Sequence, residues 1–575
     1  MSGKNQIVIV TQPNAEISEV KIFPQQFNQA INATIQINGN AKWKSEDCSW
    51  TIPFTIDTLN IVDDLVDKHN LTIAFETYNE LLFQTTEKKQ KINASKAIDT
   101  DIDIPRPAGL EYRGYQKAGI EYAINHKDVL IGDEPGLGKT IQAIGISNAT
   151  PWIQRVLVIA TSSLKSNWKT EWEKWCVKKL SVGVVKNGDA KSWPDTQVAI
   201  ISFDLVKKHL KPIHARIWDL LIVDEAHFLR NPDALRTKYI FGHIEKASKK
   251  NQYKPVITPA IPRKKTALLT GTPIVNRPKE IWPLIHAVAP QKYNNFEKFA
   301  LRYCGAKRTR YGWVYDGATN LRELQADLRS LCMIRRLKND VLTELPPKTR
   351  QIICIDDEAI NKAEQAATRR MFDKPEYTNG KELLQILADE NKRTYEETVA
   401  ALETLNKIAF FDMAKIRKET AIRKIPYVID LINIAKENGK LIIFAHHEEI
   451  FKALMAQYPN EFAMVTGATP PAKRQAEADR FQNDPACRYF FGSILAAGAG
   501  FTLTASAHVI FAEIDWVPGN MLQAEDRAHR IGQNSNVLIW HIVINRTLDA
   551  IMAKILVRKQ ADIDQATNYR QMETA

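Results

Sequence analysis

Short apolar runs alternate with longer stretches of helical spacing from about residue 106 onward. The first group of runs is VLIG, RVLVIAT, QVAIISF, LLIVDE and TALLTGT, rich in Val, Ile and Leu and closed by Gly, Ser, Thr or acidic residues. Near-continuous apolar strands that alternate with helices are typical of a parallel sheet covered on both faces. The pattern therefore predicts an α/β lobe over residues 106–355.

The same rhythm returns after a stretch of mostly helical pattern at residues 356–430. The later apolar runs are KLIIFAHH, YFFGSILAAG, HVIFAEI and VLIWHIVI, which extend the pattern to about residue 560. We therefore predict a second parallel-sheet lobe over residues 431–575, joined to the first by a helical inter-lobe segment. The fold class predicted from the pattern is α/β, with two lobes built on parallel sheets.

The first 105 residues have a different, mixed pattern. ATIQINGNAKWKSEDCSWTIPF predicts a strand, a turn and a strand, and IDTLNIVDDLVDKHN has apolar positions at helical spacing. The region ends in KINASKAIDTDIDIPRPAG, whose charges, Ser and Thr content and two prolines indicate a linker. Residues 1–105 are therefore predicted to form a small α+β accessory domain with its linker.

Composition and charge add a class of partner. The chain has 575 residues, enough for roughly three to four domain-sized units, and a formal net charge of +12. That charge favours a polyanionic partner such as nucleic acid, with a basic, well-solvated surface as the alternative. A Lys- and Pro-rich insertion, IEKASKKNQYKPVITPAIPRKK, predicts a solvated loop, and nucleic-acid contact is its alternative function.

Cysteine usage and hydropathy indicate the compartment. Six cysteines are scattered singly, without zinc-site spacing, which favours a reducing setting. The N-terminus lacks a basic segment followed by an apolar one, and no run of about 18 apolar residues occurs. We expect a soluble intracellular protein, in the cytoplasm or nucleoid, in a nucleus, or in a host cell if its origin is viral.

A phosphate-binding loop follows the first apolar run, in VLIGDEPGLGKT, residues 129–140. Gly136 and Gly138 allow backbone N–H groups to point inward, and the helix that begins near Lys139 presents an anion-attracting N-terminus. The Lys139 side chain can reach the β- and γ-phosphates, and the Thr140 hydroxyl can bind Mg²⁺. Asp133 replaces the first glycine of the usual pattern, so a chance match is the alternative.

Two adjacent carboxylates end another run, LLIVDEAH. Asp224 can face the Mg²⁺ shell, and Glu225 can polarise an attacking water. A solvated turn at a strand end is the alternative. In QAEDRAHRIGQ, Arg527 and Arg530 lie three residues apart and share a helix face, which suits stabilisation of a γ-phosphoryl transition state. A solvated face is again the alternative, and the arginines would reach the nucleotide only when the lobes close.

These elements, in this order, resemble the Swi/Snf-like branch of the superfamily 2 helicases and translocases over about residues 106–560. The matching segments are YRGYQ (112–116) for the Q motif, DEPGLGKT for motif I, VLVIATSSLKSNW (156–168) for Ia, ISFD (201–204) for Ib, DEAH for II, LLTGTP (268–273) for III, LIIFAHH (441–447) for IV, ILAAGAGFTLTAS (494–506) for V and QAEDRAHRIGQ for VI. In that branch DE-x-G-L-G-K-T is the expected loop, which makes Asp133 a branch marker; Pro135 stands where relatives usually carry methionine.

The resemblance implies that the two lobes are RecA-like, and it implies further residue roles. For the nucleotide, the resemblance implies that Gln116 binds the adenine edge. It also implies that Asp133 and Gly500 bind the nucleotide together with the glycines of the phosphate loop. Arg527 and Arg530 become arginine fingers. A relay between the ATP site and the nucleic-acid track is formed by Thr270, Gly271 and Thr272. Phosphate contacts to DNA are assigned to Ser162, Ser202 and Thr502, with buried, internally bonded hydroxyls as an equally plausible alternative.

Within this branch, residues 302–350 and the segments FAHH and FAEIDWVPGNMLQAEDR resemble the annealing-helicase, fork-remodelling subgroup. NGNAKWKSEDCSWTIPF resembles the HARP repeat that precedes the motor in that group. The resemblance implies that Trp43 and Trp50, with Lys42 and Lys44, form a stacking and charged surface for branched or single-stranded DNA. A small hydrophobic core is the alternative for these aromatic residues.

The function expected from the resemblance is a DNA-dependent ATPase, a translocase that remodels or anneals branched DNA in replication or repair with weak sequence preference. The alternatives are a duplex translocase that strips or remodels DNA-bound proteins, and a DNA-binding scaffold switched by nucleotide. ATP and Mg²⁺ are the expected cofactors, and DNA is the expected partner, duplex, forked or annealing. Single-strand-binding or replication proteins are candidate protein partners, and the chain is expected to be monomeric.

Overall fold

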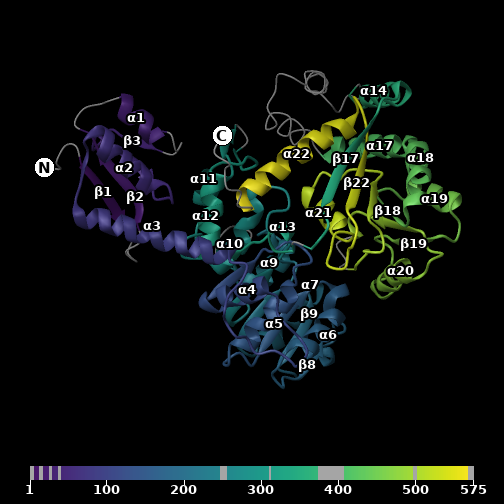
Figure 1. Ribbon diagram of the computed structural model, residues 1–575, viewed down its shortest axis with the longest axis horizontal. Helices are drawn as coiled ribbons and strands as arrows, with labels where there is room; N and C mark the ends of the chain where they lie inside the picture. Colours follow the sequence, from purple (N-terminus) through teal and green to yellow (C-terminus); the bar gives the residue numbers. More distant parts are fainter. Residues whose placement is uncertain are drawn as a thin grey trace. The chain divides into compact units, whose positions relative to one another are not determined.

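The computed structural model describes residues 6–11, 17–24, 29–36, 41–245, 256–309, 312–342, 344–372, 407–496 and 501–567 (Figure 1). The chain divides into two compact units. One comprises residues 1–97 with 322–333, and the other comprises residues 98–321 with 334–575. The N-terminal unit is therefore built from two separate stretches of sequence.

The N-terminal unit is an α+β fold around a five-stranded sheet with the order β3-β4-β2-β1-β5. All its neighbouring strands are antiparallel except the parallel pair β1 and β5. Its elements are β1 (Gln6–Thr11), β2 (Ile17–Phe23), α1 (Gln29–Gln36), β3 (Lys42–Lys44), β4 (Ser49–Pro53), α2 (Thr58–His69), β5 (Thr72–Ile73), α3 (Phe75–Lys96) and α12 (Leu321–Leu331).

Two local predictions for this unit were wrong. Residues 33–36, expected in a strand, end helix α1, because Ile31 and Ile35 lie one helical turn apart and are both buried in the core. Residues 91–96, expected in a linker, complete helix α3, which binds α12 through an ion pair of 2.6 Å between Lys88 and Asp327. The helix therefore continues through the charged stretch that suggested a linker.

The first lobe of the larger unit contains a seven-stranded sheet with the order β16-β6-β13-β10-β7-β9-β8. The strands are β6 (Asp128–Ile131), β7 (Val156–Ala160), β8 (Val182–Val184), β9 (Val198–Ser202), β10 (Trp218–Val223), β13 (Arg263–Leu269) and β16 (Met333–Ile334). The pairs from β6 through β8 are parallel, as the apolar runs predicted. Helices α4 (Gly114–Asn125), α5 (Lys139–Ala149) and α6 (Lys165–Trp175) pack on one face of the sheet.

Shorter elements complete this lobe. They are α7 (Phe203–Val206), α8 (Leu210–His214), α9 (Leu235–Phe241), β11 (His243–Glu245), β12 (Val256–Thr258), α10 (Trp282–Val288), α11 (Phe296–Tyr303), β14 (Lys307–Thr309), β15 (Gly312–Val314) and α13 (Lys338–Val341). The Lys- and Pro-rich insertion expected as a loop contains the end of β11, β12 and the start of β13, and its residues 246–255 lie outside the described residues.

The second lobe contains a six-stranded parallel sheet with the order β17-β22-β21-β18-β20-β19. The strands are β17 (Lys348–Ile355), β18 (Leu441–Ala445), β19 (Phe462–Val465), β20 (Tyr489–Ser493), β21 (His508–Phe511) and β22 (Val537–Ile544). Although β17 precedes the predicted lobe boundary at residue 355, all eight of its residues pair with β22. The edge strand of the second sheet therefore precedes the helical segment in the sequence.

Helices cover both faces of this second sheet (Figure 1). The helices are α14 (Glu358–Phe372), α17 (Lys407–Arg423), α18 (Ile425–Ala435), α19 (Glu448–Gln457), α20 (Pro471–Asn483), α21 (Pro518–Glu525) and α22 (Leu548–Thr567). Along β18, Leu441 and Ile443 pack with α17–α19, whereas Ile442 and Phe444 pack with α20 and α21, because successive side chains of a strand point to opposite faces. Within the predicted segment 356–430, residues 373–406 lie outside the described residues.

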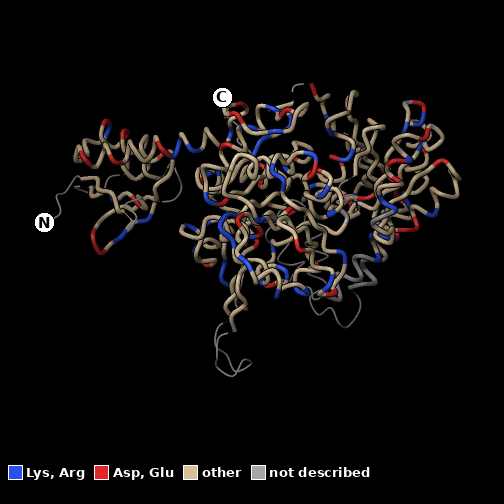
Figure 2. The backbone as a smooth tube through the Cα atoms, turned by 90° about the horizontal axis from the view of Figure 1, so that it is seen from below, with Lys and Arg blue, Asp and Glu red and all other residues tan. Residues whose placement is uncertain are grey.

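Charged residues are spread along the part of the chain that the structure describes (Figure 2). Figure 2 shows basic and acidic residues interspersed along the described backbone, so the net charge of +12 does not come from one segment. Among the described helices, none combines the length and apolar character needed to cross a bilayer.

Candidate functional site

The phosphate loop connects β6 to α5 and has the backbone that its glycines permit. Gly136 and Gly138 have φ values of 91° and 75°. Residues that carry a Cβ rarely adopt positive φ values of this size. Lys139 begins α5 and donates from Nζ to the carbonyl oxygens of Asp133, at 2.8 Å, and Glu134, at 3.2 Å. The ammonium group is thus held over its own loop, where phosphate oxygens can replace the carbonyl acceptors.

Asp133 is fully buried beneath this loop. Its carboxylate accepts hydrogen bonds from the Arg336 guanidinium at 2.8 and 3.0 Å and from Gln142 Nε2 at 2.9 Å. Burial alone would raise the pKa of Asp133, but the adjacent Arg336 outweighs it and holds that pKa below its usual value. The carboxylate therefore contacts protein groups and anchors the loop from below.

Gln116 lies on α4 and is buried against the same loop. Its Nε2 donates to the carbonyl oxygen of Leu137 at 3.3 Å, and its Oε1 accepts from the backbone N–H of Arg113 at 3.0 Å. A Cβ added to Gly138 would lie 2.4 Å from Gln116 Nε2. The Q-motif glutamine therefore packs directly on the phosphate loop, and Gly138 makes that approach possible.

The two motif II carboxylates lie just beyond the end of β10. Asp224 accepts a hydrogen bond from Nε1 of Trp168 at 2.8 Å. Trp168 was not among the predicted site residues. Glu225 has a left-handed backbone, with φ 50° and ψ 48°, which is uncommon for a residue with a side chain and is found at functional sites. The two carboxylates have different partners, since Asp224 contacts Trp168 and Glu225 contacts His227.

The surroundings of Asp224 and Glu225 shift the pKa values of the two acids in opposite directions. Burial and the charge of Glu225 raise the pKa of Asp224. Burial acts in the same direction on Glu225, but His227, Lys139 and Arg527 outweigh it and lower the pKa of that carboxyl. Glu225 is therefore the acid of the pair that stays ionised more readily, as a group that must accept a hydrogen bond from water requires.

A line of polar contacts leads away from Glu225. His227 Nδ1 lies 3.2 Å from Glu225 Oε2 and 3.1 Å from Thr270 Oγ1, which also accepts from the backbone N–H of Thr272 at 3.1 Å. Thr272 Oγ1 in turn accepts from Gln523 Nε2 at 3.2 Å. These contacts join motif II to motif III, and motif III to motif VI of the second lobe.

Gly271, between the two threonines, touches the phosphate loop. A Cβ on Gly271 would lie 2.5 Å from Pro135 Cγ and 2.8 Å from Pro135 Cδ. The carbonyl oxygen of Gly271 accepts from Arg335 at 3.0 Å, and Arg335 also donates to the carbonyl oxygen of Gly132 at 2.5 Å. Pro135 therefore has a packing role, because its ring lies between motif I and motif III.

The motif VI arginines reach this region from the second lobe. Arg530 Nε lies 3.6 Å from the position that a Cβ on Gly136 would take. Arg527 is buried, and among the described residues its Nε has no hydrogen-bond partner. Burial and the neighbouring Arg530 lower the pKa of Arg527 to about 10, so it remains charged at neutral pH. A buried guanidinium with an unsatisfied donor fits an anionic ligand.

A buried ion pair joins the lobes beside these arginines. Lys338, from the segment after β16, donates from Nζ to Asp526 Oδ1 at 2.7 Å, and its backbone N–H donates to Glu134 at 2.6 Å. Both side chains of the Lys338–Asp526 pair are less than a tenth exposed. One lysine thus connects the phosphate loop with motif VI.

Motif IV is held by an acid at the end of the neighbouring strand. Glu513 accepts from the backbone N–H groups of His446 and His447 at 2.7 and 2.8 Å, and its Oε1 lies 2.7 Å from His447 Nδ1. Although burial opposes ionisation, these hydrogen bonds lower the pKa of Glu513 to about 2. Motif IV is therefore anchored to the residues that follow β21.

The candidate DNA hydroxyls lie in different environments. Ser162 follows β7 and is exposed, whereas Ser202, the last residue of β9, is buried. Thr502 is half-buried, and its hydroxyl accepts from Arg530 at 3.2 Å. The structure therefore gives Ser162 a solvent-facing position and connects Thr502 to the arginine of motif VI.

In the N-terminal unit, Trp43 and Trp50 face each other across β3 and β4. Their rings meet edge to face, with centroids 5.4 Å apart. Trp50 belongs to the hydrophobic core, while Trp43 is 40% exposed beside the exposed Lys42 and Lys44. One tryptophan is therefore a core residue that supports the other at the surface.

For a divalent metal, the described residues offer no group of three or more His, Cys, Asp or Glu side chains. The two oxygen donors predicted for Mg²⁺ are Thr140, half-buried at the start of α5, and Asp224, just beyond the end of β10. A site of this kind takes its remaining ligands from phosphate and water. Gly500, also predicted on the nucleotide side, lies outside the described residues.

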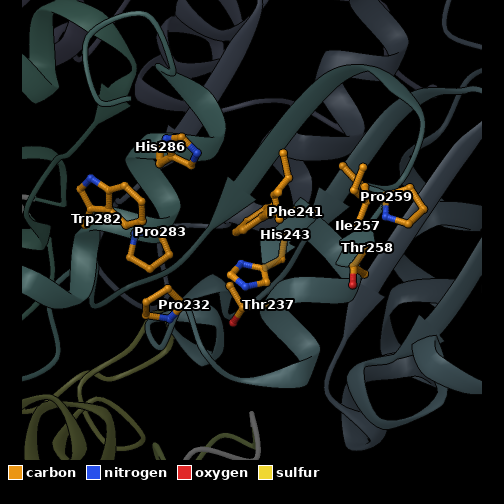
Figure 3. Close-up of a pocket in the computed structure, with 13 residues that line it drawn as sticks. Pro232, Thr237, Phe241, His243, Ile257, Thr258, Pro259, Trp282, Pro283 and His286 are labelled. Carbon is orange, nitrogen blue, oxygen red and sulfur yellow. The ribbon is translucent and has the colours of Figure 1, made fainter. Parts of the chain in front are cut away.

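A separate pocket of about 520 Å³ lies in the first lobe (Figure 3). It is lined mainly by apolar and aromatic side chains, with Trp282 and His286 on one side and Ile257 and Pro259 on the other. None of the predicted nucleotide or DNA residues lines it. The residues predicted to bind phosphate are therefore separate from this pocket.

Several residues of the site were not predicted from the sequence. Trp168, His227, Arg335 and Arg336 hold predicted residues in place through the contacts described above, and Lys338 joins the phosphate loop to motif VI. His227 stands within the DEAH segment, and the other four stand in quoted motif or family segments, so the signal was position within a motif. Their partners could not be predicted, because no local pattern pairs residue 133 with residue 336.

Two parallel-sheet lobes that bring a phosphate loop and two arginines together are the arrangement of RecA-like nucleotide-binding proteins. A family model described as the SNF2-related domain matches residues 115–409, and one described as the helicase conserved C-terminal domain matches residues 423–532. The chain therefore belongs to the SNF2-related family.

Curated relatives support the same placement. "DNA annealing helicase and endonuclease ZRANB3" of Bos taurus is 35% identical over 463 residues, covering 77% of this chain and 39% of that protein. "SWI/SNF-related matrix-associated actin-dependent regulator of chromatin subfamily A-like protein 1" of Xenopus tropicalis is 33% identical, covering 80% of this chain and 46% of that protein. The Caenorhabditis elegans homolog of the latter is 29% identical and covers 94% and 73%. This chain spans less than half the length of the first two relatives.

Proposed function

We propose that this chain is a DNA-dependent ATPase that moves along DNA and remodels or anneals branched DNA. The observation that carries the proposal is the meeting of two lobes at one site. Arg530 of the second lobe lies beside Gly136 of the phosphate loop, and Arg527 is close enough to lower the pKa of Glu225. A site completed only by the second lobe couples ATP turnover to the relative position of the lobes.

Each group has a role in ATP hydrolysis. Lys139 binds the phosphate oxygens in place of its present carbonyl acceptors. Glu225 orients and polarises the attacking water, and Arg527 and Arg530 stabilise the charge that develops on the transferred phosphoryl group. When bound, Mg²⁺ would neutralise phosphate charge, with the Thr140 hydroxyl and the Asp224 carboxylate on its protein side. Gln116, packed on the loop, is assigned to the adenine.

The contact line from Glu225 supplies the coupling. A change in hydrogen bonding at Glu225 acts on His227 and Thr270, which lie next to it in that line. Thr272 extends it to Gln523 of the second lobe. Because Pro135 packs on Gly271, movement of the phosphate loop also acts directly on this segment. Motif III therefore acts as the relay between nucleotide state and lobe position.

The DNA assignment rests on family membership and on exposed residues. Ser162 is exposed and can donate to a backbone phosphate, and Thr502 is linked to Arg530, which makes it a DNA contact sensitive to nucleotide state. Trp43 offers a stacking face in the N-terminal unit. The relatives named for DNA annealing support the branched-DNA role proposed here.

The test measures ATP hydrolysis by purified protein with blunt duplex, forked and single-stranded DNA. Glu225→Gln is expected to lower turnover by at least about 100-fold while ATP still binds, because it removes the ionised acceptor for water. Glu173→Gln, which changes an exposed acid on α6, is the control and should retain full turnover. Unchanged turnover in Glu225→Gln would contradict the catalytic assignment.

The choice of DNA separates the proposal from its alternatives. Stronger stimulation by forked DNA than by blunt duplex supports remodelling of branched DNA. Equal stimulation by both would favour a translocase that acts on duplex DNA or on DNA-bound proteins. Nucleotide binding without turnover would favour a switched scaffold.

A further inference from the structure

A short hairpin in the first lobe has no role in the function proposed above. It consists of β14 and β15, whose register places Arg308 opposite Trp313. Because side chains alternate between the faces of a strand, Tyr315 lies on the same face as Trp313. Their rings stack with centroids 6.4 Å apart and planes 8° apart. One face of the hairpin therefore carries a guanidinium and two parallel aromatic rings.

This face is open to solvent and positively charged. Trp313 is 43% exposed, and Lys307 and Arg308 are exposed as well. The segment GAKRTRYGWVY, residues 305–315, contains no acidic residue to offset Lys307 and Arg308. Aromatic rings among basic side chains form the surfaces that bind unpaired nucleic acid, since any base can stack and the backbone phosphates need cations.

The base of the hairpin is tightly fixed. The backbone N–H of Gly317 donates to the carbonyl oxygen of Cys304 at 3.0 Å, and a Cβ on Gly305 would lie only 3.1 Å from the Gly317 Cα. Asp316 pairs with Arg277, which stands five residues after Thr272 of the relay. The hairpin is therefore attached directly to the segment that continues motif III.

A row of aromatic contacts supports the hairpin from behind. Tyr315 meets Phe296 with centroids 5.3 Å apart, Phe296 meets Trp282 at 5.3 Å, and Trp282 stacks on His286 at 4.7 Å. The last two residues line the pocket of Figure 3. The exposed ring of Trp313 and the half-buried ring of Tyr315 are thus held by packing that reaches the body of the lobe, which reduces the entropy lost when a ligand binds.

We propose that the β14–β15 hairpin binds an unpaired segment of the DNA strand, with one base stacked on Trp313 and a backbone phosphate bound by Arg308. This assignment rests on the proposed DNA-dependent function. It makes the hairpin the part of the motor that distinguishes DNA with unpaired nucleotides from blunt duplex, and its attachment through Arg277 connects that contact with the relay.

The test compares wild type with Trp313→Ala, Trp313→Phe and Trp152→Ala. Trp152 is a matched control because it is 50% exposed, lies in the same lobe and has Lys264 over its ring. The DNA concentration for half-maximal ATPase stimulation is measured with forked DNA and with blunt duplex of the same length. For forked DNA, Trp313→Ala should raise it at least about fivefold, the effect of one lost base-stacking contact, while the blunt-duplex value is unchanged.

Two further readouts report the contact itself. Quenching of 2-aminopurine placed in the unpaired arm should be lost in Trp313→Ala and kept in Trp313→Phe, which retains an aromatic face. Arg308→Ala should lower the slope of log binding constant against log salt by about 0.7 on single-stranded DNA, the loss of one phosphate contact.

The hairpin proposal is overturned if Trp313→Ala matches Trp152→Ala on forked DNA with quenching intact. It is also overturned if Trp313→Ala weakens the blunt and forked responses equally. If the wild type hydrolyses ATP without stimulation by any DNA, the proposed function itself fails, and the hairpin assignment falls with it.

Discussion

The contact between Gly271 and Pro135 gives the sharpest prediction for the relay. In Gly271→Ala the new Cβ would lie 2.5 Å from Pro135 Cγ and 2.8 Å from Cδ. Carbon atoms pack best at about 3.5–4.0 Å, so the substitution requires a displacement of about 1 Å between motif I and motif III. The φ of Gly271 lies outside the left-handed region, so the contact is the source of the strain.

The magnitude follows from what that displacement disturbs. Overpacking of this kind costs about 1–3 kcal/mol of unfolding free energy. It also shifts the carbonyl oxygen that accepts from Arg335 and the N–H of Thr272 that donates to Thr270. Because a misplacement of about 1 Å can lower a catalytic rate by about 100-fold, we expect ATP turnover to fall further than stability does.

The assay is a double-mutant cycle measured by denaturant unfolding and by ATP turnover. Pro135→Ala removes Cγ and Cδ, so the double variant should recover most of what Gly271→Ala loses, with a coupling of at least about 1 kcal/mol. Gly467→Ala is the control, because a Cβ there meets nothing within 4 Å. Simple additivity of the two single variants would refute the reasoning.

Three further outcomes are expected. Asp133→Asn should lower the unfolding free energy by about 3 kcal/mol, measured by chemical denaturation, because it leaves the Arg336 charge buried without its partner. Lys338→Met should destabilise the protein by up to about 3 kcal/mol, because it removes the nearer of two lysines from the buried Asp526 and leaves Lys348 at 3.6 Å, and no loss would show that Lys348 alone satisfies the carboxylate. The pKa of Glu513 falls from an ordinary 4.5 to about 2, so its contribution of up to about 3 kcal/mol is present above pH 4.5 and is lost as the pH falls toward 2. Glu513→Gln should flatten that acid limb in a pH series of melting temperatures.

Local patterns predicted the strands of both lobes well. Runs such as LLIVDE and KLIIFAHH are apolar on both faces because both faces of each sheet are covered, and the structure confirms parallel strands there. The prediction failed where a local pattern was ambiguous. ATIQ alternates like a strand, but the spacing of Ile31 and Ile35 suits a helix, and packing of both against the core decided in favour of α1.

The candidate site was predicted as a set of motifs, without their contacts. Asp133 was interpreted as a branch marker near the nucleotide, and its burial against Arg336 depends on residues that are 203 positions apart. Trp43 and Trp50 were equivalent in the sequence, and only burial separates the core residue from the exposed one. Such differences arise from packing, which hydrophobic periodicity does not encode.

By itself, the sequence determined most strands and helices of the two lobes, the order of the motifs and the chemistry that each motif offers, because periodicity and motif spacing are local properties. The tertiary structure alone decided which motifs touch. It placed Pro135 against Gly271, connected motif II to motif VI through Thr270 and Thr272, and assigned residues 322–333 to the N-terminal unit. These outcomes depend on the burial of side chains from distant parts of the chain against one another, and that burial exists only in the folded state.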